Sequence, residues 1–546
     1  MGKGKKKAAG AASAGQKVMR AGVEAAVNEA VAMQDSAGDL PPHQASTALE
    51  AAARRYRDAL ARLPKHAEAA YNLATCLSEQ ADLKHDAREQ ARGSMGRWVT
   101  LMRESRSLLE AVIEADTSGR GATTALARHA LGNVICAMVA LFRDHCPTIS
   151  ANPCGDCCIG CPPAAACKEE LAQACRHLEA AVSITQRLQN QSQSGDMEDI
   201  LVHWGDTLAS MMQIGMDVDS AEARSTGRHP SPSPGSVQEA FALCSDACSK
   251  YSRALSLETS GGGSDTDILR LKAGTVVNFL DWALPEAPQQ LPTAGVNIGF
   301  SPDALIVAGE QAVGVLLGLD GGNVGGLLAK GDLCRLGARA WMLSGGGVQE
   351  EGARREESVE WFARAVAGFP QDAEALTAAG EGLLEYGRRS LTIFKETAVS
   401  AQGRYGSPAL PAPQLEGMRM AAVTRLQEAG NLLSRACSVD TSDPDSAYNA
   451  ACAFALSGDP SSCFQALSEY CRRLTVGLTA SAARNDATAT SVISRSSSSC
   501  SSSKRDSARW SLREAGTDVD LEGVRGFPWF ADLLRVTDSN LAAILS

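Results

Sequence analysis

Small and apolar residues recur along this chain at the spacing of one face of a helix. The first clear set, placed at i, i+4 and i+7, consists of Ala52, Tyr56 and Ala59. Pro64 then ends that helix. A second helix is predicted from Ala67, where the run Ala-Glu-Ala-Ala-Tyr-Asn-Leu-Ala closes on the small residue Ala74. The pattern therefore predicts two helices that approach closely.

The same arrangement returns in the second half of the chain. The spacing of small, aromatic and small residues is repeated by Ser358, Phe362 and Ala365, with Pro370 behind them. Gly380 follows an Ala-Glu-Ala opening, and a third opening runs from Ala447 to Gly458. Weaker copies are Leu131-Gly132-Asn133, Trp204-Gly205-Asp206, Lys330-Gly331-Asp332 and the set Ala247, Tyr251, Ala254. Matching internal spacing in separated segments indicates a repeat.

This pattern resembles the tetratricopeptide-repeat (TPR) family over about residues 44–474. The resemblance implies an all-α fold, a TPR-like α-solenoid of antiparallel helix pairs, with roughly seven or eight pairs. The units run beyond the family's period of ~34 residues, because loops at 225–235, 285–302 and 404–413 are inserted between or within pairs. The resemblance also implies a concave groove, lined by the first helix of each pair, that binds other proteins.

The pattern divides the chain into four parts. We expect a basic disordered tail and lead-in helix in residues 1–40, and the TPR-like helical array in residues 41–476, with a Cys-rich insertion at 145–167. We expect a Ser-rich linker in residues 477–508 and a C-terminal helical cap in residues 509–546. The cap resembles a segment that often closes TPR proteins, and its core-covering residues would be Leu521, Phe530, Leu533 and Leu534.

Charge and composition narrow the classes of partner. The formal net charge of −11 argues against nucleic acid as a partner, since nucleic-acid binding needs a basic surface. No apolar run approaches the length of a membrane helix, and a secretory signal is missing, so we expect no membrane partner. The expected location is cytoplasmic, with a nuclear or organellar location as the alternative.

Cysteine supplies the most chemically suggestive motif. Seventeen cysteines occur, and single ones within helical patterns, such as Cys76 and Cys334, are expected to be buried small hydrophobes. A cluster of candidate zinc or iron–sulfur ligands contains Cys154, Cys157, Cys158 and Cys161. Two of the four are adjacent and fit one tetrahedron poorly, so the favoured interpretation is an insertion without a cofactor. The alternative function is a metal-binding or redox-responsive module at 145–167.

Signs of catalysis are weak. All eight histidines lie at or before His229, and the chain has no H-E-x-x-H motif or Walker-type phosphate loop. His203, beside Trp204, is expected to be a groove or packing residue rather than a catalytic base. We therefore expect a protein–protein interaction scaffold or adaptor, not an enzyme.

The resemblance places specific side chains in the predicted groove. These residues are Tyr71, Thr75, His129, Asn133, Asp206, Asp332, Thr377, Glu381 and Tyr448. Chaperone-binding TPR domains clamp a carboxylate with Lys and Asn, and here only Asn133 fits that clamp. The acids Asp206, Asp332 and Glu381 would repel a carboxylate. The groove is expected to bind a basic or apolar segment of a partner, and the alternative is that its acids only solubilise the surface.

Overall fold

The computed structural model describes residues 3–86, 92–116, 118–119, 121–145, 163–189, 195–225, 232–257, 264–284, 301–403, 411–441, 443–489, 516 and 518–545. The chain divides into two compact units. Unit 1 comprises Met1–Ala221 and Ala242–Gly261, and unit 2 comprises Glu222–Phe241 and Gly262–Ser546. Every regular element in the described residues is a helix, which confirms the predicted all-α class.

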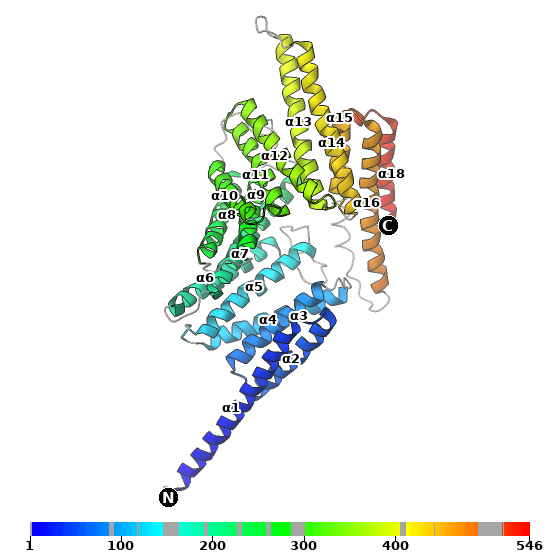
Figure 1. The fold of residues 1–546 in the computed structure, drawn as a ribbon. Coiled ribbons are helices and arrows are strands. Elements are labelled where there is room, and N and C mark those ends of the chain that lie inside the picture. The colour runs from blue at the N-terminus through cyan, green and yellow to red at the C-terminus, as the bar shows by residue number, and fades with distance from the viewer. Residues whose placement is uncertain are drawn as a thin grey trace. The chain divides into compact units, whose positions relative to one another are not determined.

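Unit 1 is built from helices that follow one another in pairs. Their bounds are α1 (Lys3–Ala37), α2 (Pro42–Arg62), α3 (Ala67–Asp86), α4 (Arg92–Ala115), α5 (Ala122–His145), α6 (Ala164–Gln189), α7 (Gly195–Ser225) and α8 (Pro234–Leu255), the last of which begins in unit 2. From α1 to α6 each helix packs on the next, and the first helices of neighbouring pairs also meet, as α1 with α3 and α3 with α5 (Figure 1). This is the packing expected of a helical repeat array.

Unit 2 continues the same arrangement. Its helices are α9 (Ser264–Ala283), α10 (Pro302–Leu319), α11 (Val324–Leu343), α12 (Val348–Gly368), α13 (Ala373–Gly403), α14 (Ala412–Val439), α15 (Asp445–Ser457) and α16 (Pro460–Ala489), followed by the 3-10 helix η2 (Val519–Val524) and α18 (Pro528–Leu545). Consecutive helices pack on each other, and α9, α11, α13 and α15 also pack in sequence. The long helices α13 and α14 extend side by side past their neighbours in unit 2 (Figure 1).

We call the odd-numbered helices A helices and the even-numbered helices up to α16 B helices; the described residues contain eight A/B pairs. The B helices carry buried residues at i, i+4 and i+7, in the sets Ala52-Tyr56-Ala59, Ala174-Leu178-Ala181, Ala247-Tyr251-Ala254, Ser358-Phe362-Ala365 and Ala429-Leu433-Ala436. The middle residue of four sets covers a glycine of the paired A helix, as Leu178 covers Gly132, Tyr251 covers Gly205, Phe362 covers Gly331 and Leu433 covers Gly380. The strong and the weak predicted repeats are therefore confirmed as one motif.

A hydrogen bond repeats with the motif. The buried hydroxyl of Ser105 on α4 donates to the Ala74 carbonyl oxygen at 2.8 Å, and Ser358 on α12 donates to the Gly331 carbonyl oxygen at the same distance. In both pairs the acceptor belongs to the small residue where the A helix meets the B helix. A buried hydroxyl needs such a partner, and the bond also fixes the relative position of the two helices.

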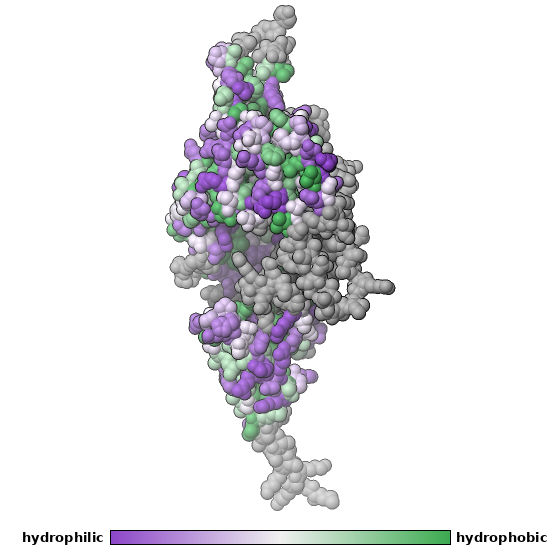
Figure 2. Space-filling model, turned by 90° about the vertical axis from the view of Figure 1, so that its right-hand side faces the viewer, coloured by the Kyte–Doolittle hydropathy of each residue, from purple (hydrophilic) through white to green (hydrophobic). Residues whose placement is uncertain are grey.

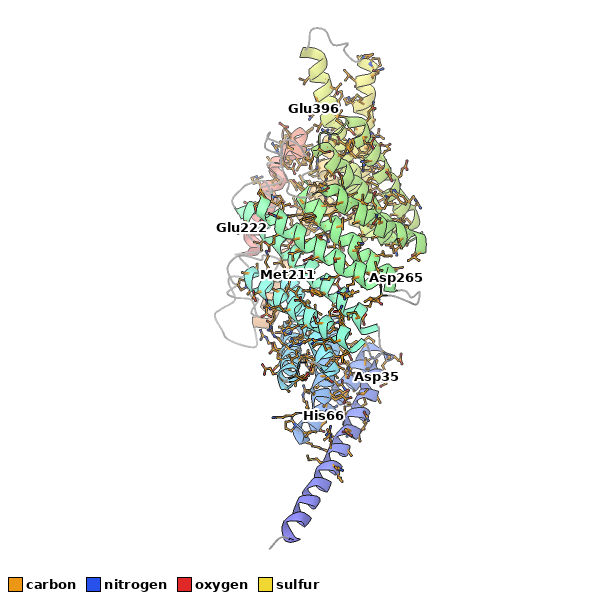
Figure 3. The ribbon with its side chains drawn as sticks, turned by 90° about the vertical axis from the view of Figure 1, so that its left-hand side faces the viewer. Asp35, His66, Met211, Glu222, Asp265 and Glu396 are labelled. Carbon is orange, nitrogen blue, oxygen red and sulfur yellow. The ribbon has the colours of Figure 1, made fainter. Side chains whose placement is uncertain are left out.

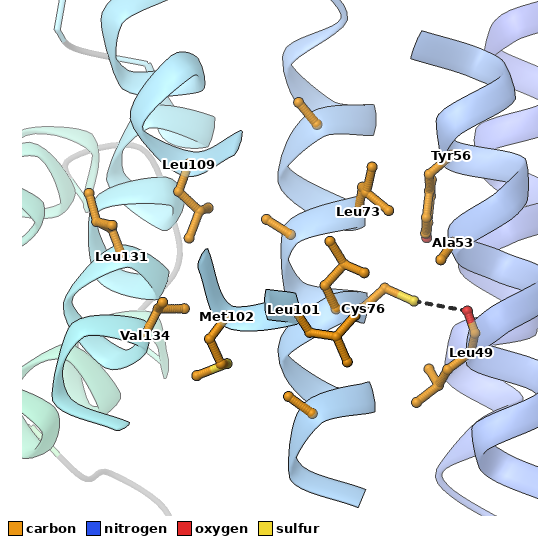
Figure 4. Close-up of a cluster of buried hydrophobic side chains, with 14 of the residues drawn as sticks. Leu49, Ala53, Tyr56, Leu73, Cys76, Leu101, Met102, Leu109, Leu131 and Val134 are labelled. Atoms are coloured by element: carbon orange, nitrogen blue, oxygen red, sulfur yellow. Dashed lines mark hydrogen bonds between the residues drawn. The ribbon is translucent and has the colours of Figure 1, made fainter. Parts of the chain in front are cut away.

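Small and medium side chains fill the core of unit 1 between the helices. Figure 4 shows Leu49, Tyr56 and Leu73 converging from α2 and α3, with the thiol of Cys76 donating to the Leu49 carbonyl oxygen at 3.3 Å. The ring of Tyr56 is fully buried, while its hydroxyl donates to Gln34 on α1 at 3.0 Å. The Tyr56 side chain thus provides both apolar packing and a polar contact between α1 and α2.

The predicted cap closes the last pair. Helices η2 and α18 pack on α15 and α16, with Leu521 and Phe530 buried and Leu533 and Leu534 partly buried against the same core. The hydroxyl of Tyr448 donates to Asp518 at 2.5 Å. The apolar end of the array in unit 2 is therefore covered by the C-terminal segment, as the sequence predicts.

Two predicted segment boundaries differ from the structure. Helix α1 begins at Lys3, so helix occupies the residues predicted to form a disordered tail. Helix α16 runs on to Ala489, so helix also occupies the first part of the predicted linker at 477–508, and residues 490–515 lie outside the described part. Alanine-rich sequence extends each helix, because alanine has the highest helix propensity.

Two described helices are long and apolar enough to cross a membrane by length and composition, namely Ala122–Arg143 within α5 and Pro302–Leu319, which is α10. The expectation that no segment reaches this length is wrong for them. Both are members of the packed array, α5 between α4 and α6 and α10 against α9 and α11.

Candidate partner-binding face

Contacts between neighbouring A helices involve five of the predicted groove residues, namely Thr75, His129, Asn133, Thr377 and Glu381, and we call the side of the A helices that carries them the A-helix face. In unit 1 it begins with Thr75, whose hydroxyl receives a hydrogen bond from the Gln34 amide at 3.4 Å. The same amide donates to Glu79 at 2.8 Å. Gln34 thus joins α1 to α3, and Thr75 belongs to a polar network between helices. Tyr71, one turn earlier, is partly buried against the core of unit 1.

His129 and Asn133 on α5 meet His203 on α7. Nε2 of His129 lies 2.7 Å from Nδ1 of His203, and the Asn133 amide nitrogen lies 3.4 Å and 3.3 Å from these two ring nitrogens. Burial, followed by the neighbouring His203, lowers the pKa of His129 to about 4. The two predicted groove residues on α5 therefore contact His203, which was predicted to be a groove or packing residue.

Asp206 has a partner of its own. It accepts a hydrogen bond from the Tyr251 hydroxyl at 2.7 Å, and burial raises the pKa of its carboxyl. The ring of Tyr251 also covers Gly205, the small residue where α7 crosses α8. Asp206 therefore supports the α7/α8 pair, which the sequence analysis did not anticipate.

In unit 2 the A-helix face lies over a buried network of arginines and carboxylates. Glu385 on α13 accepts hydrogen bonds from Arg335 at 2.9 Å, Arg339 at 2.9 Å and 2.5 Å, and Arg355 at 2.7 Å. Burial alone would raise the pKa of Glu385, but the guanidiniums of Arg339 and Arg335 hold it well below its ordinary value. Glu385 is therefore a permanent carboxylate inside the protein.

Further residues extend the network in both directions. Glu351 on α12 accepts from Arg355 at 3.1 Å and from Arg389 on α13 at 2.9 Å. Asp281 on α9 lies 3.1 Å from both Arg335 and Arg339. Asp332 accepts from Arg335 at 2.9 Å. The predicted groove acid Asp332 is thus neutralised by an arginine one turn further along its own helix.

Glu381 differs from the other acids of this face. Its side chain is exposed, and its hydrogen-bond donor is Asn449 on α15 at 2.9 Å. Although the residue reaches the surface, the protein around its carboxyl partly desolvates it and raises its pKa to about 7; Arg335 opposes this shift, while Asp281 and Asp332 add to it. Thr377, one turn earlier on α13, shares a hydrogen bond of 3.1 Å with Ser446. Two polar contacts therefore join α13 to α15 along this part of the face.

Tyr448, the last predicted groove residue, lies at the junction with the cap. Its ring packs against Tyr470 with centroids 5.2 Å apart, and its hydroxyl contacts Asp518. The sequence also gave no role to Asp281, Arg335 or Asn449. Arg335 lies three residues after Asp332, a spacing that was visible in the sequence, whereas the contact of Asn449 with Glu381 depends on the packing of two separate pairs.

The cysteine predictions divide into two groups. Cys76, Cys334, Cys452 and Cys463 are buried and free, and burial raises the pKa of the Cys76, Cys334 and Cys463 thiols to about 12, as expected for inert core residues. The candidate ligands Cys154, Cys157, Cys158 and Cys161 lie outside the described residues, so their zinc or iron–sulfur role stays a prediction. Within the described part, no group of three His, Cys, Asp or Glu side chains is placed to hold a metal.

Polar and apolar residues alternate over short distances on the described surface in Figure 2, and hydrophobic residues gather only in small patches there. Figure 3 labels Met211 on α7, whose sulfur is 3.9 Å from the Cys175 sulfur on α6. Both helices belong to unit 1, and soft sulfur-containing side chains fill the space between them.

Comparison with known proteins gives distant similarity only. No family model and no curated protein sequence matches the chain. A solved circular tandem repeat protein is 13% identical over 97% of both chains with a TM-score of 0.30, and yeast Tom70 is 12% identical over 93% of this chain and 99% of its own with a TM-score of 0.16. A human IFIT1 dimer solved with PPP-AAAA is 13% identical over 79% of this chain and 86% of its own, with a TM-score of 0.19.

At such TM-scores these similarities say nothing about function, and the assignment depends on the chain's own packing. Eight A/B pairs follow one another in the described residues, and a glycine faces a large side chain where four of them cross. The C-terminal helices cover the last core. The described part of the chain has the fold of a TPR-like α-solenoid of antiparallel helix pairs.

Proposed function

We propose that this chain is a protein-interaction scaffold whose A-helix face in unit 2 binds a basic segment of a partner protein. The observation that carries the proposal is the charge arrangement around Glu381. Four arginines of the network, Arg335, Arg339, Arg355 and Arg389, form ion pairs with Asp281, Asp332, Glu351 and Glu385. Glu381 is a fifth acid, one more than the four arginines. Among the described residues, no arginine donates a hydrogen bond to it.

A lysine or arginine of a partner would supply the missing cation. Glu381 is exposed, and its carboxylate is already oriented by the Asn449 amide. Asp445, exposed on the same side of α15 one turn before Asn449, provides a second negative charge. Charge complementarity of this kind selects a partner and orients it. The buried network beneath keeps α11, α12 and α13 in fixed positions, so the face is preorganised.

The pKa of Glu381 adds a pH dependence to binding. With a pKa near 7, the carboxyl is largely protonated at pH 6 and largely ionised at pH 8. Only the ionised form attracts a cation, so affinity for a basic segment should rise with pH across this interval. The groups that act on this carboxyl are Asp281, Asp332 and Arg335. Removing the titrating group should remove the pH dependence.

The test compares the wild-type chain with Glu381→Gln, which keeps the shape and hydrogen-bonding capacity of the side chain but not its charge. Glu396→Gln is the matched control, because Glu396 is exposed further along the same helix (Figure 3). Partners are captured from native lysate with each variant, and the affinity of the purified partner is then measured at pH 6 and pH 8.

We expect Glu381→Gln to weaken partner binding about tenfold at pH 8, equivalent to ~1.4 kcal/mol, with little change at pH 6. Glu396→Gln should bind as wild type at both values. Partners that bind Glu381→Gln and wild type equally at pH 8 would show that this acid only solubilises the surface. Reversal of Asp206 or Asp332 to lysine would not be a clean test, because each acid supports a neighbouring side chain.

A further inference from the structure

The strongest unexplained cluster in unit 1 is formed by His129, Asn133 and His203. His129 and Asn133 lie one turn apart on α5, and His203 faces them from α7. The two imidazole rings are 4.9 Å apart between centroids, and their nearest nitrogens are 2.7 Å apart. All three side chains are partly buried. Two ring nitrogens and one side-chain amide, all of which can ligate a metal, therefore meet between α5 and α7.

The hydrogen bonding of this cluster is incomplete. A bond between two neutral imidazoles uses one proton and one lone pair, so the facing nitrogens satisfy each other. The Asn133 amide nitrogen then faces two nitrogens with no acceptor left over, at 3.4 Å and 3.3 Å. Its carbonyl oxygen Oδ1 is buried without a hydrogen-bond partner. Turning the amide by 180° exchanges its two atoms and directs the oxygen towards both ring nitrogens.

We propose that His129, His203 and Asn133 form a binding site for a divalent transition-metal ion, with Zn²⁺ as the expected occupant. Zinc–nitrogen bonds of about 2.0–2.1 Å in a tetrahedron separate the ligand atoms by roughly 3.3 Å. The amide already lies at that separation from both nitrogens. The two ring nitrogens, now 2.7 Å apart, must move about 0.6 Å further from each other, and a water molecule completes the coordination.

One carboxylate lies near the cluster, and metal binding uses the neutral form of each imidazole. The Asp206 carboxylate interacts electrostatically with His203 and adds negative charge nearby. Burial raises the pKa of the neighbouring Cys136 thiol to about 11, so this thiol stays protonated, 3.0 Å from the Thr207 hydroxyl.

This site is independent of the proposed partner-binding face and of the Cys cluster. It lies in unit 1, whereas Glu381 lies in unit 2. Its ligands are two imidazoles and an amide oxygen, a set suited to zinc, cobalt or nickel rather than to magnesium. A bound ion would join α5 to α7 across two neighbouring pairs and so stabilise unit 1.

The experiment uses Co²⁺ as a spectroscopic probe of the metal-free full-length chain. To exclude the predicted Cys site, the chain carries Cys154→Ser, Cys157→Ser, Cys158→Ser and Cys161→Ser. We expect one equivalent of Co²⁺ to bind, with visible d–d absorption, no thiolate charge-transfer band, and displacement by Zn²⁺. Zn²⁺ should also raise the melting temperature.

Two variants and one control complete the design. His129→Ala and His203→Ala should each weaken Co²⁺ binding at least tenfold and abolish the rise in melting temperature. His177→Gln is the matched control, because His177 is a partly buried histidine of unit 1 that contacts Arg128 instead. If His129→Ala or His203→Ala loses helicity, Co²⁺ binding is measured with His203→Gln in its place. Absence of saturable Co²⁺ binding, or equal binding by the His203 and His177 variants, would overturn the proposal.

Discussion

At the scale of single residues, a small side chain at each crossing sets the distance between the two helices of a pair. A Cβ atom on Gly331 would lie 2.6 Å from the ring of Phe362, and one on Gly205 would lie 2.5 Å from the ring of Tyr251. Separations under about 3 Å are excluded by atomic repulsion, so alanine at these positions forces the helices apart. Glycine is present there for close approach, although it lowers helix propensity.

We therefore expect Gly331→Ala to destabilise unit 2 by about 1–3 kcal/mol, the usual consequence of overpacking a core. Gly352→Ala on α12 provides the control, since a Cβ there meets no atom within 4 Å. That change should stabilise the chain by about 0.5–1 kcal/mol through helix propensity alone. Urea unfolding of both variants measures the difference, and equal midpoints would contradict the close-packing account.

These crossing residues were readable in the sequence because the small–aromatic–small spacing is local. The role of Asp206 was not readable, and that of Asp332 was visible only as the i, i+3 spacing to Arg335. Both were predicted to face a partner, but Tyr251 and Arg335 occupy their carboxylates. The contact of Asp206 with Tyr251 depends on the packing of two helices, and no local pattern encodes it.

At the scale of elements, buried ion pairs join α13 both to α12, the helix before it, and to α11, with which it shares no turn. The single side chain of Glu385 accepts hydrogen bonds from two other helices. The donors are Arg335 and Arg339 on α11 and Arg355 on α12. The charges of this group are almost entirely removed from solvent, and the exposed side-chain fraction of Arg339 is 2%. In such an environment each charge is tolerated only while its partners remain.

Glu385→Gln should consequently lower the free energy of unfolding of unit 2 by about 3–5 kcal/mol, because it leaves buried guanidiniums without a counter-charge. The control is Glu416→Gln on α14, whose ion pair with Arg419 is exposed to solvent and should change the free energy of unfolding little. Chemical denaturation followed by circular dichroism gives both values. A loss below 1 kcal/mol for Glu385→Gln would show that water enters the network and screens it.

At the scale of the whole molecule, the two longest connections between helices of the A/B pairs lie within pairs. They run from α5 to α6 and from α9 to α10, and each joins an A helix to its own B helix. Connections from a B helix to the next A helix include short ones, such as the four residues from Phe369 to Asp372. Insertions in repeat proteins gather in this way when one set of turns must stay intact.

An insertion test follows from this distribution. Fifteen Gly/Ser residues placed in the α7–α8 connection should lower the melting temperature only slightly, because doubling a loop costs about 0.6 kcal/mol. The same segment inserted between Phe369 and Asp372 should lower the free energy of unfolding by about 1 kcal/mol or more beyond that loss. The reason is that Asp372 caps α13 by accepting a hydrogen bond from the Ala375 amide at 2.8 Å. Equal melting temperatures would show that neither class of connection restrains the array.

The fold was largely predictable because repetition strengthens a weak local signal: each copy of the motif supports the others. The sequence identified α2 by its motif but predicted α1 only as a lead-in helix, because α1 begins in a Lys- and Gly-rich segment without the motif. Yet Val23, Val27 and Ala30 of α1 are buried. The candidate site was predictable only in outline. His129 and Asn133 were found from their positions in the repeat, but their contact with His203 required the packing of α5 beside α7.

The buried arginine network also constrains how this chain can evolve. Repeat proteins ordinarily gain and lose units by duplication and deletion of single pairs. Here Asp281, Arg339, Glu351 and Glu385 come from four helices and depend on one another for neutrality. Deleting or duplicating one of these helix pairs would leave a charged side chain without its partner in the protein interior. The stretch from α9 to α13 is therefore expected to be inherited as one block, while single pairs elsewhere remain free to duplicate.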